Sequence, residues 1–275
     1  MNIFVLKLIL APIILGGASL AGRRWGHAVS GWLVGLPLTS GPIIFFLSLS
    51  RETTFVSSTI LGTLSGGFSL VAFCLVYAWL AMRFRWLLAL TGSMLIYFGI
   101  VALMQNFVIV PLAPLIAGVA FAILLGLWLM PKETQLESND VRPGRWDIPA
   151  RILLGTSFII LLTEIAPFIG ARLTGLLATI PLYTAILTVF AHRLQGAAGA
   201  ASVLRGLLFG LFGFLGFFLT LSLLIERAGI TIGFLAASAA TLLIQGITLL
   251  VLRIEHQSET LASGASAGVS KEKRR

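Results

Sequence analysis

Two stretches of the sequence, 35–42 and 181–184, place prolines beside hydroxyl side chains inside long apolar runs. Proline removes a backbone donor and clashes with the preceding helical turn, so each stretch predicts a broken membrane helix. The freed backbone groups need partners, which neighbouring hydroxyls or a ligand can supply, and the positive end of each half-helix favours an anion. The candidate substrate-binding residues are Pro37, Thr39, Ser40, Pro181, Tyr183 and Thr184. The alternative is that both prolines only kink helices and shape the bundle.

Few ionisable residues lie inside apolar stretches, where burying a charge is costly and usually functional. Glu164 is the carboxylate deepest in such a stretch, and it is either a proton-coupling group or an interfacial residue paired with Arg172. Arg205 is either an anchor that reaches the membrane surface or a counter-charge in an anion path. Lys7 is expected to be a surface anchor of the same kind.

Several catalytic signatures are missing from the sequence. There is no Walker A loop, no H-E-x-x-H and no G-x-S-x-G motif. The single cysteine, Cys74, excludes an internal disulfide, and the three histidines have no metal-ligand spacing. We therefore expect no enzyme activity, no cofactor and no metal.

The composition indicates the elements that must position these residues. Of 275 residues, 58% are hydrophobic and 11% are charged, and the mean hydropathy is +1.03. A soluble domain has roughly a quarter charged residues, so a soluble enzyme, a nucleic-acid binder and a disordered protein are excluded. The apolar runs predict an all-α membrane protein with about nine transmembrane helices. These runs are 3–21, 29–49, 55–81, 86–104, 108–130, 150–167, 173–191, 199–225 and 230–252.

Basic residues alternate between the predicted loops. Three arginines, Arg51, Arg172 and Arg227, occupy one set of loops. The other set holds Arg23, Arg24, Arg83, Arg85, Lys132, Arg142, Arg145, Arg151, Arg193, Arg253, Lys271, Lys273, Arg274 and Arg275. Because cytoplasmic loops carry the excess of Lys and Arg, the N-terminus is predicted outside and the C-terminus in the cytoplasm. The alternative is that 1–21 is a cleaved signal peptide.

An internal repeat appears when the sequence is shifted by 144 residues, and 26–83 then matches 170–227 at four glycines and at Pro37. Four spans lie in each half and one lies between them, which predicts a 4+1+4 inverted-topology repeat like those of secondary transporters. The predicted parts are a first repeat at 1–104, a connecting helix at 105–130, a cytoplasmic linker at 131–149, a second repeat at 150–252 and a disordered tail at 253–275.

Matched small-residue motifs occur in the third and eighth predicted spans. The first is Gly62-x-x-x-Gly66, and the second is Gly206-x-x-x-Gly210. Glycines at this spacing allow two helices to approach closely. We expect these two spans to pack tightly, against each other if the repeat has two-fold symmetry.

The segment Gly170–Thr184, with its first-half partner Gly31–Pro42, resembles the small four-span GlpM-like bacterial membrane proteins over about 1–104 and 145–252. The resemblance implies a duplicated and fused protein of the bacterial inner membrane. A looser similarity is to ten-span, inverted-repeat drug and metabolite transporters.

The expected function is a secondary transporter or facilitator of a small polar or anionic solute that works by alternating access. One alternative is a flippase for lipids or lipid-linked precursors, which should have a lateral opening between spans. Another is a non-transporting subunit of an envelope-biogenesis complex, with no central cavity. The expected partners are the bilayer, the solute and a second copy of the chain, with no nucleic acid.

Overall fold

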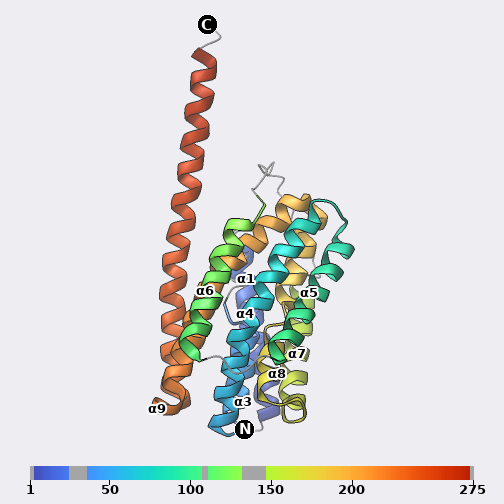
Figure 1. The fold of residues 1–275 in the computed structure, drawn as a ribbon, viewed down its shortest axis with the longest axis vertical. Helices are drawn as coiled ribbons and strands as arrows, with labels where there is room; N and C mark the ends of the chain where they lie inside the picture. Colours follow the sequence, from blue (N-terminus) through green and yellow to red (C-terminus); the bar gives the residue numbers. More distant parts are fainter. Residues whose placement is uncertain (1–2, 25–35, 107–110, 132–146, 273–275) are drawn as a thin grey trace.

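The structure, a computed structural model, describes residues 3–24, 36–106, 111–131 and 147–272, and every regular element in those ranges is a helix (Figure 1). The predicted all-α class is confirmed for this part of the chain. The helices are α1 (Ile3–Arg24), α3 (Ser40–Ser48), α4 (Thr53–Ala81), α5 (Trp86–Asn106), α6 (Leu112–Leu129), α7 (Asp147–Ile169), α8 (Ala171–Ala178) and α9 (Leu182–Glu272).

Helix α9 bends sharply at two glycines. Gly196 has φ 70° and Gly229 has φ 80°, conformations that glycine adopts without the penalty that a Cβ would bring. The bends divide α9 into a first segment at 182–195, a second at 197–228 and a third at 230–272. Figure 1 shows the third segment rising past the rest of the bundle toward the C-terminus.

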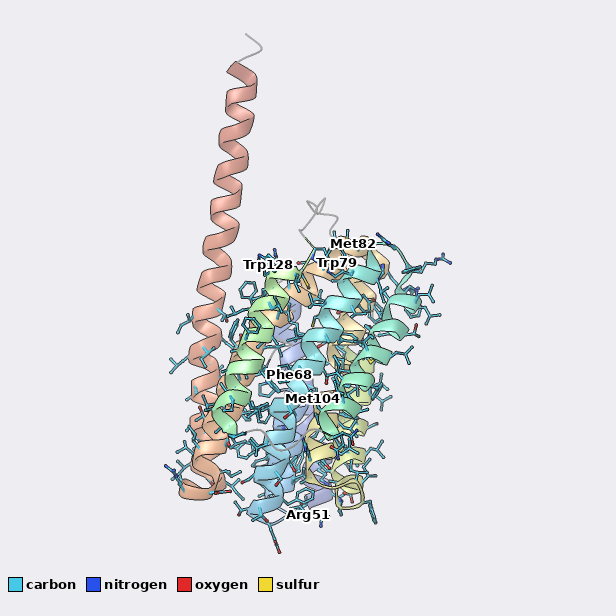
Figure 2. The ribbon with its side chains drawn as sticks, viewed as in Figure 1. Arg51, Phe68, Trp79, Met82, Met104 and Trp128 are labelled. Atoms are coloured by element: carbon cyan, nitrogen blue, oxygen red, sulfur yellow. The ribbon has the colours of Figure 1, made fainter. Side chains whose placement is uncertain are left out.

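Five helical stretches in the described residues are long and apolar enough to cross a membrane. They are Thr53–Ala81, Trp86–Asn106, Leu112–Leu129, Ile148–Ile169 and Ala171–Thr248. The outward surface is also apolar, since Phe168 and Trp128 are 88% and 79% exposed (Figure 2). A surface of this kind suits hydrocarbon rather than water, so the chain is a multi-pass helical membrane protein.

Helix α4 lies at the centre of the bundle and packs against α5, α6, α8 and α9. Side chains from both halves of the sequence, including Leu64, Phe73, Leu176 and Phe218, form one apolar core. The two predicted repeats therefore do not have separate cores.

Two glycines of α4 and one of α8 lie where these two helices meet. A Cβ on Gly62 would collide with the Arg172 carbonyl, a Cβ on Gly66 with the Thr179 hydroxyl, and one on Gly175 with the Thr59 carbonyl. The close approach was correctly predicted for Gly62 and Gly66. The predicted partner was wrong for these two glycines. They lie against the start of the seventh predicted span, at 173–191, rather than against the eighth, at 199–225.

The two short helices after the proline stretches run in opposite directions. Helix α3 leads to Arg51, at the end of the bundle opposite Trp79 and Met82 (Figure 2). The first segment of α9 leads the other way, because His192 lies 3.4 Å from the Tyr77 hydroxyl and Arg193 lies over the ring of Trp86.

Candidate functional site

The predicted interruption at Pro181 is present. Helix α8 ends at Ala178, and the chain becomes helical again at Leu182. Proline disfavours helical backbone in the residue before it, so Ile180 cannot continue α8. The amide of Leu182 donates to the Ile180 carbonyl at 2.8 Å. We call residues 179–181 the second break.

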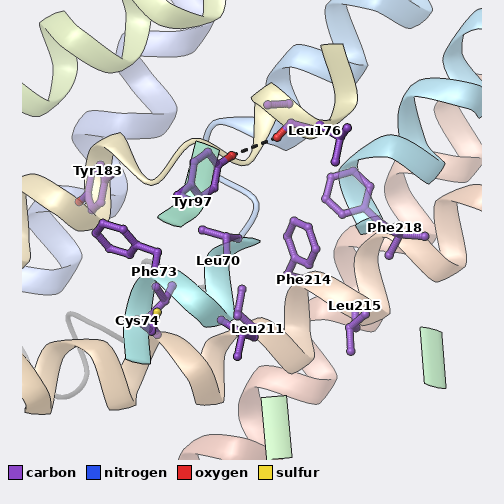
Figure 3. Close-up of a cluster of buried hydrophobic side chains, with 14 of the residues drawn as sticks. Leu70, Phe73, Cys74, Tyr97, Leu176, Tyr183, Leu211, Phe214, Leu215 and Phe218 are labelled. Atoms are coloured by element: carbon purple, nitrogen blue, oxygen red, sulfur yellow. Dashed lines mark hydrogen bonds between the residues drawn. The ribbon is translucent and has the colours of Figure 1, made fainter. Parts of the chain in front are cut away.

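Helix α5 supplies a partner for the carbonyls that the second break frees. The Tyr97 hydroxyl donates to the Leu176 carbonyl at 3.1 Å (Figure 3). It also lies 2.9 Å from the Thr179 hydroxyl. The Thr179 hydroxyl also lies 2.7 Å from the Leu176 carbonyl. Tyr97 is fully buried, so the end of α8 is closed by side-chain hydroxyls. Nothing in our sequence analysis pointed to Tyr97, since its partners lie 79 and 82 residues away.

A non-helical stretch also precedes α3. Residues 36–39 are irregular, and α3 begins at Ser40 after a cap residue, Thr39, whose side chain makes no capping hydrogen bond. The amide of Leu38 donates to the Leu36 carbonyl at 2.7 Å. We call residues 36–39 the first break. The predicted half-helix before it, at 29–35, lies outside the described residues.

The two breaks lie on either side of one small cavity of about 40 Å³. Five of the six candidate residues line it, and the sixth, Pro37, does not. Its lining is Leu36, Leu38, Thr39, Ser40, Leu70, Ala178, Thr179, Ile180, Pro181, Tyr183, Thr184, Leu207, Leu211 and Phe214. We call this the break cavity. It brings together segments that are about 140 residues apart in the sequence.

Residues related by the 144-residue shift meet at the break cavity. Adding 144 to Leu36, Thr39, Ser40 and Leu70 gives Ile180, Tyr183, Thr184 and Phe214, and all eight residues line it. The two halves therefore contribute corresponding positions to the same space.

The charges around the break cavity favour an anion. Helix α3 and the first segment of α9 both begin there, and neither has an acidic residue in its first turn. The partial positive charge of each helix start is thus not neutralised locally. None of the lining residues is acidic or basic.

One cation does lie next to the cavity. The Arg151 guanidinium carbon is 4.8 Å from the centroid of the Tyr183 ring, and Arg151 is only 4% exposed. The Tyr183 hydroxyl, in turn, lies 2.8 Å from the Ser19 hydroxyl of α1. Arg151 was predicted from the sequence to be a loop residue that sets the topology, and nothing local in the sequence marks it as buried.

Glu164 lies outside the break cavity and is paired with a lysine. Its carboxylate is 2.9 Å from the Lys7 ammonium, with 60% of the glutamate side chain and 6% of the lysine side chain exposed. The predicted pairing of Glu164 with Arg172 was wrong, since Arg172 donates to the Met104 carbonyl at 2.7 Å. Lys7 is also not a surface anchor. It is a buried cation held by its partner.

Arg205 lies on the second segment of α9 and does not line the break cavity. Its Nε atom is buried and has no hydrogen-bond partner among the residues that the structure describes. Its expected role as a counter-charge stays a prediction. Within the described ranges, no group of three His, Cys, Asp or Glu side chains could hold a metal ion.

No protein-family model, curated protein or solved structure matches the chain. The resemblance to GlpM-like proteins therefore stays a prediction, and the break cavity is the best guide to function.

Proposed function

We propose that the chain is a secondary transporter or facilitator of a small polar or anionic solute that works by alternating access. The observation that carries this proposal is the break cavity, where two non-helical stretches from different halves of the sequence meet with neighbouring hydroxyl side chains. Discontinuous helices that meet at a repeat interface are the usual substrate site of inverted-repeat transporters.

The described helices support nine spans in a 4+1+4 plan. The stretch Ala171–Thr248 has 78 residues, which at about 1.5 Å each would extend about 117 Å, several times the roughly 30 Å of a bilayer core. The bends at Gly196 and Gly229 divide this stretch into three crossings, the first of which contains the second break. The opposite directions of α3 and the first segment of α9 support inversion of the second half.

The position of α1 supports its retention as the first span. Lys7 and Ser19 of α1 contact Glu164 and Tyr183, which belong to α7 and α9. The distribution of basic residues supports an N-terminus outside and a C-terminus in the cytoplasm. The resemblance to GlpM-like proteins implies the bacterial inner membrane.

The volume of the break cavity supports a mechanism with movement. A water molecule takes about 30 Å³ in the liquid, so a cavity of about 40 Å³ holds roughly one. A solute would enter only when the halves move apart on one side. Rocking of one half against the other would then open the same hydroxyl groups to each side in turn.

Thiol labelling tests alternating access without knowledge of the solute. Thr184→Cys would be introduced with Cys74→Ala, which removes the single native cysteine, and the protein would be reconstituted in vesicles. We expect a membrane-impermeant maleimide to label the new thiol from either side. Ala237→Cys, fully buried outside the break cavity, should stay unlabelled. Labelling of Thr184→Cys from one side only, or from neither, would favour the non-transporting alternative.

Paired cytoplasmic and periplasmic reporters test the nine-span plan. Signals are expected to be out, out, in, in, out and in for fusions after Glu52, Asn106, Asp140, Gly196, Gly229 and Arg275. If fusions after Glu52 and Gly196 report the same side, the halves are parallel or the number of spans is wrong.

A further inference from the structure

A larger cavity, open at the surface, lies beside the break cavity. It has a volume of about 380 Å³, and we call it the lateral groove. Its lining comes from α1, the first break, α3 and the second and third segments of α9: Leu10, Ile14, Leu36, Pro37, Leu38, Gly41, Pro42, Phe45, Phe217, Phe234, Ser238, Thr241 and Leu242. Its size is within the roughly 300–1,000 Å³ of ligand sites, but its lining is almost entirely apolar.

The lateral groove and the break cavity adjoin each other. Leu36 and Leu38 line both. Thr39 and Ser40 line only the break cavity, whereas Pro37 and Gly41 line only the groove. The short stretch 36–41 therefore has a polar side and an apolar side, and it separates a space that favours an anion from one that favours hydrocarbon.

The groove is not a necessary consequence of the repeat. Subtracting 144 from Thr241 gives Tyr97, whose ring is fully buried and whose hydroxyl contacts the Leu176 carbonyl and the Thr179 hydroxyl at the second break. The corresponding residue, Thr241, is smaller and lines the groove beside the first break. The two corresponding positions therefore carry side chains of different size, and the groove lies beside the smaller one.

We infer that the substrate is an amphiphile whose polar or anionic head occupies the break cavity once the halves have moved apart, while one hydrocarbon chain lies in the lateral groove. This inference rests on the proposed function and specifies the substrate class for the same site. A solute without a hydrocarbon chain would make no contact with the apolar lateral groove beside the break cavity. A methylene group has roughly the volume of a liquid water molecule, about 30 Å³, so the groove has room for about a dozen.

The experiment uses the full chain in phosphatidylcholine vesicles with a trace of lysophosphatidate that carries a diazirine in its single acyl chain. After illumination, mass spectrometry locates the adducts. We expect Phe45, Phe234 and Leu242 together to carry at least fivefold more adduct than Leu243. Leu243 is 70% exposed on the same helical segment but does not line the groove, so it reports ordinary boundary lipid.

Two groove-filling variants and a matched control sharpen this test. Ser238→Trp alters an exposed groove residue, and Thr241→Tyr introduces the side chain found at the corresponding position. Each should lower the groove adducts at least fivefold, whereas Leu243→Trp should leave them unchanged. Lysophosphatidylcholine with the same photoreactive acyl chain has a zwitterionic head group. It should give severalfold fewer groove adducts than lysophosphatidate.

Adducts spread evenly over groove and control residues, or adducts unaffected by both groove variants, would overturn the inference and identify the groove as a place for bulk lipid. Equal groove labelling by lysophosphatidate and lysophosphatidylcholine would overturn the inference that the break cavity holds an anionic head group. Failure of the proposed function would appear separately, as one-sided thiol labelling of Thr184→Cys, because that measurement needs no substrate.

Discussion

The two breaks have similar sequences but different surroundings. At the second break, Tyr97 and Thr179 close the end of α8 with hydroxyl groups that are shielded from the surface. At the first break, the cap residue Thr39 makes no side-chain capping bond, and Pro37 faces the open lateral groove. One break is therefore fixed by its neighbours, and the other has space beside it.

A single pair of corresponding residues accounts for much of this difference. The Tyr97 hydroxyl reaches across to another helix at 3.1 Å. The shorter bond of the Thr241 hydroxyl, 2.8 Å, goes to the Ala237 carbonyl of its own helical segment, and its contact with the Gly213 carbonyl on the second segment is 3.4 Å. A repeat in the sequence thus gives a symmetric cavity but not symmetric surroundings. An asymmetric pair of breaks suits a substrate with two chemically different ends.

The largest expected effect comes from opening the second break. Tyr97→Thr makes the closed position resemble the open one, and it removes a buried ring together with its interhelical hydrogen bonds. We expect a loss of about 3 kcal/mol in the free energy of unfolding, typical of emptying an aromatic site in a packed core. Denaturation in detergent, followed by circular dichroism, measures this loss. An unchanged midpoint would show that Tyr97 does not hold the break closed.

Next in size is the effect of adding one methyl group to the helix beside each break, in α8 before the second break and in α3 after the first. Gly175→Ala places a Cβ against the backbone of Thr59 and Thr63, so we expect a loss of about 1–3 kcal/mol. Gly41→Ala is the matched change at the first break, where the new Cβ would meet only ordinary contacts at 3.6 and 3.7 Å. Its stability should match the wild type or exceed it slightly, because alanine favours helix. Equal decreases in melting temperature for Gly175→Ala and Gly41→Ala would contradict the proposed difference in packing beside the two breaks.

Removing only the hydroxyl of Tyr97 should have a smaller effect. Tyr97→Phe keeps the ring and leaves the Leu176 carbonyl with its contact to Thr179. We expect a loss of about 1 kcal/mol, the net value of one interhelical hydrogen bond. Thr241→Val is the control at the corresponding position, and it should cost less because its main bond stays within one helix. A larger loss of stability for Thr241→Val than for Tyr97→Phe would contradict the conclusion that the Tyr97 hydroxyl makes the stronger interhelical bond.

The smallest effect on stability is expected from filling the open position. Thr241→Tyr adds a ring where the lateral groove has room, so the free energy of unfolding should change by less than about 1 kcal/mol. The melting temperature in detergent checks this. A loss as large as that from Tyr97→Thr would mean that position 241 is as tightly packed as position 97.

Much of the site could be predicted from residue types. Pro37 and Pro181 predicted two interruptions, because proline cannot continue a helix, and Thr39, Ser40, Tyr183 and Thr184 were correctly expected to lie together. Pro37 itself lines the groove instead. Tyr97 and Arg151 could not be assigned to the site from sequence, since their partners are distant in the chain and nothing local marks them.

The sequence by itself determined the helical membrane class, the breaks and their hydroxyl groups. These follow from apolar run length and from proline, which act over a few residues. Only the tertiary structure decided which contacts form around them. It paired Glu164 with Lys7, packed Gly62 and Gly66 against α8, and left the groove open at one break. The physical reason is that these outcomes depend on side-chain size and reach across helices, which a repeat in the sequence does not specify.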